Sequence, residues 1–236
     1  MFHALCLLLF SLPGTLLAGS ISVDIGQSKT AYNRFAIPNT TANRTELPQG
    51  DKVTTYRITG YFDLADNSQL YVLLAPLELD YVFVADKDFT FDGVNFDNGV
   101  ETKVKYKFNS YRVGYLKSWY TGHSGWWLGA TGKIRDAHIK VTQGNSTQTY
   151  DNVGLVPLLS FGFDLPLYSN VSLFSHIDAL WASQGSAYDA QLELKQQLNQ
   201  FSWSFGKRIL GGGVDNDKVY NFAQFDTLYI RLAAYF

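Results

Sequence analysis

The last ten residues of the chain, TLYIRLAAYF (Thr227–Phe236), decide the fold. Apolar side chains occupy every second position from Leu228 through Ile230 and Leu232 to Phe236, and Arg231 stands between them. Alternation with period two is the pattern of a β-strand with one apolar face and one polar face. The chain ends on this strand, so the strand needs a partner that leaves it no free edge.

The same alternation recurs along most of the chain. Apolar and aromatic residues fill one face of each segment, and charged residues, small polar residues or glycine fill the other. The alternating segments are 21–25, 56–62, 71–83, 111–115, 126–130, 153–163, 171–181, 188–194 and 201–205. Several of these strands are expected to run well past ten residues or so, whereas a soluble sandwich places a turn every 8 to 12 residues or so. Long alternating segments with a polar interior are typical of transmembrane β-barrels.

The connectors follow a short-long rhythm. Short ones are expected at DLADNSQ, YTGHSG, DLPLYSN and LNQ, and long ones at residues 27–50, VADKDFTFDGVNFDNGVE and LGGGVDNDKVYN. Short turns on one side and long loops on the other are typical of bacterial barrels. The sequence therefore predicts an all-β fold: a closed antiparallel transmembrane β-barrel of about ten strands (roughly 8–12), with both termini on the periplasmic side.

The first 20 residues, MFHALCLLLFSLPGTLLAGS, have the apolar core and small-residue end of a secretory signal, with cleavage expected after residue 18–20. Residues 21–236 then form a single barrel domain. Cys6 is the only cysteine and lies in the signal, which excludes disulfides, thiolate metal sites and a cysteine nucleophile from the mature chain. The formal net charge of −2 argues against a nucleic-acid partner.

The terminal strand resembles the carboxy-terminal signature of Gram-negative outer-membrane proteins, in which an aromatic residue follows alternating apolar positions. The stretches FNSYRVGY, TGKIRDAHI, NVGLVPLL and DNDKVYNFA also resemble those of a set of uncharacterised outer-membrane barrels. This resemblance implies location in the bacterial outer membrane and insertion by the barrel-assembly machinery. The expected assembly signal consists of Leu228, Ile230, Leu232 and Phe236.

The polar face of the alternation carries charges of both signs in nearly equal number. The residues predicted to form a charge network in the lumen are Asp24, Arg57, Glu78, Asp80, Arg112, Lys133, Arg135, Asp178, Asp189, Glu193, Lys195, Arg208 and Arg231. A strongly selective pore presents a ring of one sign. A balanced set in a narrow barrel is expected instead to cross-link the interior by ion pairs.

His176 and Asp178 are the candidates for catalysis, because they lie about 7 Å apart on the same face of one strand. Omptin-like proteases also use His and Asp in a ten-stranded barrel. Their sites lie in long extracellular extensions with further aspartates, whereas this chain is expected to have short strands and no such extension. The pair is therefore interpreted as an interior pair that compensates neighbouring Arg or Lys.

Three further motifs predict no activity. GHSG, with His123 and Ser124, does not match the His-x-Ser-Asn pattern of lipid A deacylases. GGGVDND, with Asp215 and Asp217, lacks the later glutamate of an EF-hand loop. Sequons at Asn39, Asn43, Asn145 and Asn170 are interpreted as exposed polar turns.

These observations predict a non-enzymatic outer-membrane barrel, either a narrow solute channel or a closed barrel with a charge-paired lumen and surface loops. The alternative is an outer-membrane enzyme, lipid A-modifying or omptin-like, acting at the barrel rim. No cofactor or metal is expected. The expected partners are outer-membrane lipids, lipopolysaccharide and the assembly machinery, and the protein is expected to be a monomer.

Overall fold

The computed structural model describes residues 18–121 and 124–236, and every regular element in these ranges is a β-strand. The strands are β1 (Gly19–Ala36), β2 (Thr45–Glu46), β3 (Val53–Leu64), β4 (Ser68–Ala75), β5 (Glu78–Val84), β6 (Phe89–Phe91), β7 (Val94–Phe96), β8 (Glu101–Thr121), β9 (Ser124–Gln143), β10 (Ser146–Tyr168), β11 (Val171–Ala182), β12 (Gly185–Leu198), β13 (Phe201–Asp215) and β14 (Tyr220–Tyr235). No helix that could cross a membrane occurs in these ranges. Nearly all of the expected signal segment, including Cys6, lies outside the described residues.

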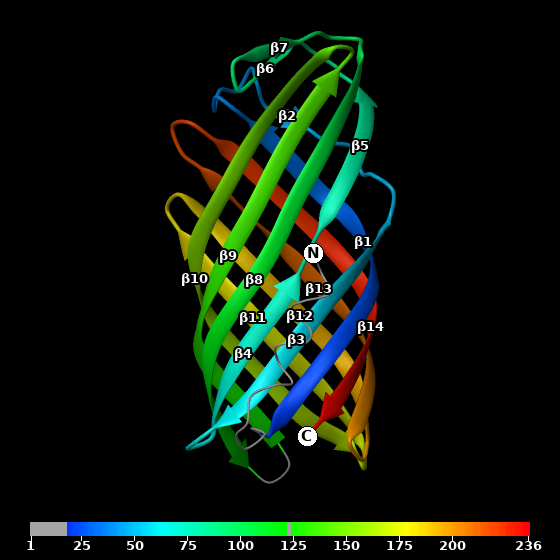
Figure 1. Ribbon diagram of the computed structural model, residues 1–236, viewed down its shortest axis with the longest axis vertical. Helices are drawn as coiled ribbons and strands as arrows, with labels where there is room; N and C mark the ends of the chain where they lie inside the picture. Colours follow the sequence, from blue (N-terminus) through cyan, green and yellow to red (C-terminus); the bar gives the residue numbers. More distant parts are fainter. Residues whose placement is uncertain (1–17, 122–123) are drawn as a thin grey trace, which may run out of the picture.

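The strands form one closed antiparallel barrel (Figure 1). Three short strands do not count as barrel positions: β6 and β7 form a separate two-stranded sheet, and β2 pairs only with the end of β1. β4 and β5 follow one another along β8 and occupy one position, so the other eleven strands fill ten positions. The barrel closes where β1 pairs with β14, with Asp24 opposite Arg231. The predicted all-β fold, a closed antiparallel barrel of about ten strands, is therefore confirmed. Backbone hydrogen bonds of 2.8 and 3.1 Å join Gly19 to Phe236. The two ends of the described chain therefore meet at one end of the barrel, which we call the terminal end. The opposite end is the loop end.

Three of the strands are long. β8, β9 and β10 contain 21, 20 and 23 residues, so the expectation of short strands without an extension is wrong. Two predicted loops are also largely strand. Residues 27–36 continue β1, and the glycines of LGGGVDNDKVYN lie inside β13, which leaves only residues 216–219 as connector. At Gly213 a Cβ would lie 2.0 Å from the carbonyl oxygen of Asn221 on β14, so this glycine allows two strands to approach closely.

The polarity of the two barrel faces reverses along the strands. Near the terminal end β8 turns Tyr111, Val113 and Tyr115 outward, whereas near the loop end it turns Lys103 and Lys105 outward. Outward-facing charges begin at Lys107 on β8, Asp136 on β9, Asp151 on β10 and Asp226 on β14. We call the part between these residues and the termini the membrane half, and the rest the loop half.

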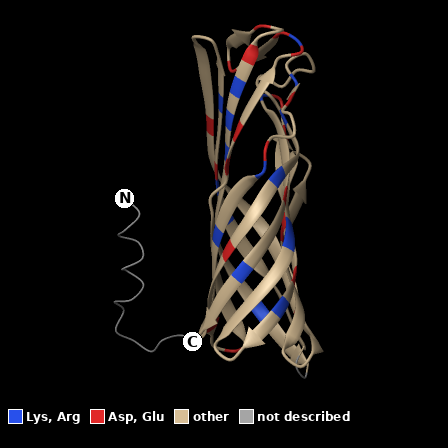
Figure 2. Ribbon diagram, turned by 90° about the vertical axis from the view of Figure 1, so that its right-hand side faces the viewer, with Lys and Arg blue, Asp and Glu red and all other residues tan. Residues whose placement is uncertain are grey.

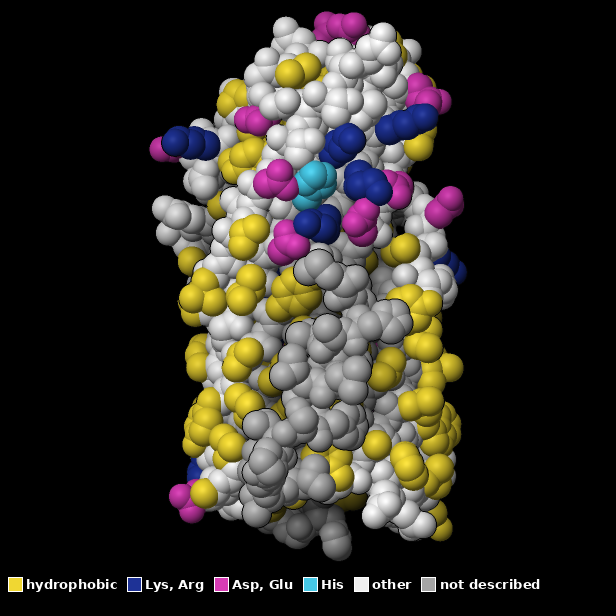
Figure 3. All heavy atoms as spheres, in the orientation of Figure 1, with side chains coloured by type: hydrophobic (Ala, Val, Ile, Leu, Met, Phe, Trp, Pro, Cys, Tyr) yellow, Lys and Arg dark blue, Asp and Glu magenta, His cyan; other side chains and the backbone are white. Residues whose placement is uncertain are grey.

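Each half has the polarity that its surroundings require. On β14 the outward side chains of the membrane half run from Leu228 to Phe236, about 27 Å along the strand at ~3.4 Å per residue. A strand tilted by about 45° crosses the hydrocarbon with about 9–11 residues, so this stretch of nine residues is long enough to span it. In the loop half the strands turn charged residues to water and apolar residues inward. On the face drawn in Figure 3, apolar side chains dominate the lower part of the molecule and charged ones gather above it. Figure 2 marks Lys, Arg, Asp and Glu along the strands of both parts.

The reversal corrects one predicted facing. Leu77 and Leu79 belong to the apolar face of the segment 71–83, which a barrel with a polar interior places outward, but they are buried inside the loop half. Glu78 and Asp80 were expected in the lumen, but they lie on the outer surface, where the Lys105 Nζ is 2.8 Å from Glu78 and 3.6 Å from Asp80. This stretch lies above the membrane, where the outer face meets water instead of lipid.

Candidate functional site

The centre of the barrel holds two groups of buried ions, each with two cations and two anions. The first quartet consists of Arg57, Arg112, Asp178 and Asp189, from β3, β8, β11 and β12. Arg112 lies 2.7 Å from Asp178 and 2.8 Å from Asp189, and Arg57 lies 2.9 Å from Asp189. All four side chains are at most 3% exposed. The group is therefore electrically balanced and joins four strands across the interior.

The second quartet consists of Asp24, Glu193, Arg208 and Arg231, from β1, β12, β13 and β14. Arg231 lies 2.6 Å from Asp24 and 2.9 Å from Glu193, and Arg208 lies 3.3 Å from Asp24. Asp24 and Arg231 face one another across the β1–β14 seam, so this quartet ties the closing seam to the neighbouring strands β13 and β12.

His176 extends the first quartet but offers no open reaction site. Its Nε2 lies 3.0 Å from the Asp178 carboxylate, and its Nδ1 lies 3.1 Å from the Trp127 Nε1 and 3.2 Å from the Tyr61 hydroxyl. The indole can only donate, so Nδ1 accepts and Nε2–H donates. Both ring nitrogens are thus occupied, and the ring is 2% exposed. This geometry suits the interior pair that the sequence suggests, and it leaves no room for a substrate.

Apolar layers lie on both sides of the quartets. Toward the terminal end, Tyr71, Leu73, Leu116 and Trp127 form one buried cluster. Toward the loop end, a larger cluster fills the interior of the loop half, with Phe35, Tyr81, Tyr106, Phe108 and Phe225 among its members. The interior is therefore filled by three successive layers: apolar, ionic and apolar.

The remaining predicted lumen residues occupy other places inside the wall. Lys195 binds Asp164 near the terminal end, with its Nζ 5.6 Å from the Phe174 ring. Lys133 is 2% exposed and its Nζ lies 4.7 Å from the Phe108 ring. Arg135 donates to the amide oxygen of Asn152. Neither Lys133 nor Arg135 forms an ion pair with a carboxylate of the described chain, which sets them apart from the quartets.

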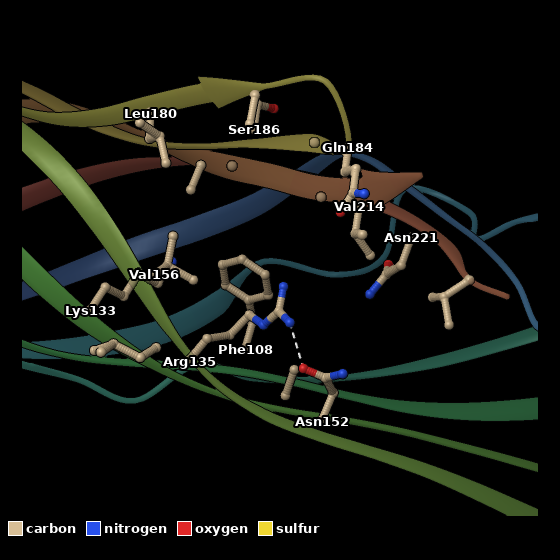
Figure 4. A pocket seen from close by; sticks show the side chains of 18 of the residues that line it. Phe108, Lys133, Arg135, Asn152, Val156, Leu180, Gln184, Ser186, Val214 and Asn221 are labelled. Atoms are coloured by element: carbon tan, nitrogen blue, oxygen red, sulfur yellow. Dashed lines mark hydrogen bonds between the residues drawn. The ribbon is translucent and has the colours of Figure 1, made fainter. Parts of the chain in front are cut away.

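A cleft opens beside Lys133 and Arg135, where the barrel wall is incomplete. Pairing between β10 and β11 ends at Leu159 opposite Ala179, although β10 continues to Ser146 along β9. The cavity in this gap has a volume of about 380 Å³. Its walls include Lys133, Arg135, Asn152, Val156, Leu180 and Val214 (Figure 4). No sequence pattern indicates this cleft, since alternation continues through both strands.

The other sequence motifs do not form a site with these residues. His123 is outside the described residues, and Ser124 begins β9. Asp215 ends β13, where its carboxylate accepts a 2.8 Å bond from the Asn39 amide. The four sequons lie in connectors: Asn39, Asn43, Asn145 and Asn170. Within residues 18–121 and 124–236, no group of three or more His, Cys, Asp or Glu side chains is placed to hold a metal ion.

Three solved structures illustrate what the fold is similar to. The outer membrane protease OmpT from Escherichia coli matches with a TM-score of 0.61 over 96% of this chain and 99% of that chain, at 7% identity. The Pseudomonas putida toluene transporter TodX matches with a TM-score of 0.39 over 93% and 90%, at 6% identity. Neisserial surface protein A matches with a TM-score of 0.37 over 92% and 97%, at 11% identity. Identities this low show the fold alone.

No protein-family model and no curated protein sequence matches the chain. The structural comparison, the closure of β14 on β1 and the apolar exterior of the membrane half carry the assignment together. The chain is a ten-stranded transmembrane β-barrel with the fold of Gram-negative outer-membrane proteins.

Proposed function

We propose that this protein is a non-enzymatic barrel of the outer membrane, closed to solutes, whose working surface is the loop half. The observation that carries the proposal is the three-layer filling of the interior. The termini would face the periplasm and the loop half the cell exterior. Because β1 and β14 already close the wall, no second copy is needed, and a monomer surrounded by outer-membrane lipids and lipopolysaccharide is expected. The terminal strand would be recognised by the assembly machinery.

The charges favour a closed barrel over a narrow channel. A channel that selects ions presents a ring of one sign and leaves its ligands free to exchange with the ion. Here each quartet compensates itself, and a passing ion would have to break short internal pairs such as Arg112–Asp178 at 2.7 Å. Above the quartets an ion would also have to cross the apolar cluster that contains Phe35 and Phe225.

Planar-bilayer recording of the refolded protein tests this proposal. We expect no steady conductance from the wild type, and intermittent conductance from the variant Arg112→Ala/Arg231→Ala, in which both quartets lose a cation. Insertion is checked independently, because a folded barrel migrates differently on a gel before and after boiling. A large, steady wild-type conductance that the double variant leaves unchanged would make an open small-solute channel the better interpretation.

An enzyme at the barrel rim is the second candidate, favoured by the fold shared with the protease OmpT and by the His176–Asp178 contact of 3.0 Å. We expect no cleavage of unstructured peptides and no deacylation of lipid A by the folded protein. Activity that disappears in His176→Gln but persists in His138→Gln would show that the buried pair is catalytic and that the closed-barrel proposal is incomplete. His138 is a matched control because it also contacts an aspartate, Asp151, at 2.7 Å.

A further inference from the structure

We propose that the cleft between β10 and β11 is a binding site for a membrane lipid with an anionic phosphate head group. The head group would lie against Lys133 and Arg135, and part of an acyl chain would fill the gap in the wall. The proposal goes beyond closure of the lumen, because the cleft opens sideways toward the membrane.

The barrel wall is open here because β10 extends farther toward the loop end than β11 does. From Leu158 back to Ser146, at the loop end, β10 is paired with β9 but not with β11. The last residues of β11, Leu180–Ala182, pair only with β12. An unpaired sheet edge is costly in hydrocarbon, because its N–H and C=O groups have no water to bond. Pro157 removes one N–H from this edge. The remaining groups require a covering that lies at the edge of the membrane.

The height of the cleft is that of the lipid head groups. On the outer face of β10, Leu155 is 75% exposed and belongs to the membrane half. Four residues toward the loop end, the Asp151 side chain is 69% exposed and belongs to the charged surface of the loop half. The cleft residues Asn152 and Val156 lie on the same stretch of strand but point inward. A lipid beside this edge would therefore have its head group level with Asn152, which accepts a hydrogen bond from Arg135.

Lys133 and Arg135 carry positive charge that forms no ion pair with a carboxylate of the described residues. Each quartet is balanced, so the charges of Lys133 and Arg135 are in excess. Lys133 is 2% exposed and its Nζ lies 4.7 Å from the Phe108 ring. The Nε of Arg135 is buried and has no hydrogen-bond partner. A buried cation without a counterion costs stability, and a phosphate group would supply the missing acceptor oxygens.

Apolar side chains line the cleft beside the basic pair. Val156 on β10 is the register partner of Lys133 on β9, and Leu180 and Val214 line the cavity from β11 and β13 (Figure 4). A volume of about 380 Å³ is at the lower end of the range for small-molecule sites. It is suited to one head group and the first part of one chain, with the rest of the lipid outside the barrel. A basic pair bordered by apolar side chains is complementary to an anionic amphiphile.

Native mass spectrometry of the full mature barrel, released from neutral detergent, tests the site. The probes are phosphatidylglycerol and phosphatidylcholine with identical acyl chains. We expect one phosphatidylglycerol to be retained at least tenfold more tightly than phosphatidylcholine, and Lys133→Met/Arg135→Gln to abolish that preference. The matched control Lys207→Met/Lys140→Met removes two outward-facing cations and should leave the preference unchanged. Leu180→Trp fills the space beside Val156 and Val214 and leaves Lys133 and Arg135 in place, so it should lower the retention of both lipids.

Each result decides the question. Equal retention of the two lipids by the wild type, or an undiminished preference in Lys133→Met/Arg135→Gln, overturns the proposal. Displacement of the bound lipid by glycerol phosphate at equal concentration would show that a soluble anion, and not a lipid, is the occupant. If the double variant fails to fold by gel migration, the Leu180→Trp result decides alone: unchanged retention in that variant also overturns the proposal.

Discussion

Removing the Arg112 side chain should destabilise the barrel strongly, because two buried carboxylates lose their shared partner. In Arg112→Met the first quartet keeps Asp178 and Asp189 but only one cation, Arg57. Hydrogen bonds to charged groups contribute about 1.5–3 kcal/mol each. The contacts at 2.7 and 2.8 Å thus amount to roughly 3–6 kcal/mol, and breaking a buried pair from one side costs about 3–5 kcal/mol. We expect a loss of about 4 kcal/mol of unfolding free energy.

The assay is urea unfolding of the protein refolded in phospholipid vesicles, followed by tryptophan fluorescence. Lys103→Met is the control, because Lys103 is 64% exposed and its contact with Glu101 is 3.5 Å; its effect should be small. The double variant Arg112→Met/Asp178→Asn restores charge balance, since Arg57 and Asp189 still pair. We expect it to recover about half of the loss or more, since a balanced pair can be replaced at little cost.

The reasoning would be refuted if Arg112→Met lost less than about 1 kcal/mol, which is the range of exposed pairs. It would also be refuted if the double variant lost the sum of the two single losses. Additivity would mean that the quartet does not act as one compensated unit.

Three further outcomes follow from other parts of the barrel. Deleting Phe236, or replacing Leu232 with Asp, should reduce insertion into membranes, because both side chains face outward, at 47% and 65% exposure, and a charge on the lipid face costs up to about 2–4 kcal/mol. Insertion is measured by the difference in gel migration before and after boiling, and Tyr235→Ala on the inner face should reduce it less. Equal effects of the three changes would contradict the assignment of these residues to the outer and inner faces. Gly162→Leu should lower the unfolding temperature, because a Cβ there would lie 2.2 Å from the Trp127 indole, and unchanged tryptophan emission would argue against the displacement. In lipid-free detergent, Lys133→Met should unfold at the same or a higher temperature than the wild type, because an uncompensated buried charge is removed; a lower temperature would show that this lysine is compensated within the protein.

The sequence predicted the membrane half well and the loop half poorly, for one physical reason. Period-two alternation shows that a strand has two different faces, but not which face is inside. For Leu228–Phe236 the outside is lipid, and the apolar face points outward. For Glu78 and Asp80 the outside is water, so the same pattern has the opposite sense. The continuation of β1 was missed because its register shifts between Thr30 and Tyr32 and interrupts the alternation.

The interior was only partly predictable. Nine of the thirteen charged residues expected in the lumen make up the two quartets and the buried Lys133. Which cation meets which carboxylate depends on the shear of the barrel, and no single strand contains that information. The cleft was not predictable either, because it arises where pairing stops between Leu159 and Ala179, and both strands continue to alternate beyond that point.

The reversal of polarity between the two halves also fixes how deeply the protein sits in its bilayer. If the barrel sank by one pair of residues along each strand, Lys107, Asp136 and Asp226 would enter hydrocarbon. If it rose by the same step, outward side chains such as Leu228 would enter water. Both displacements are opposed at β8, β9 and β14, so the barrel keeps a single level in the membrane. The side opening between β10 and β11 is therefore held at one constant depth, and only the part of a lipid that occupies that depth can reach it.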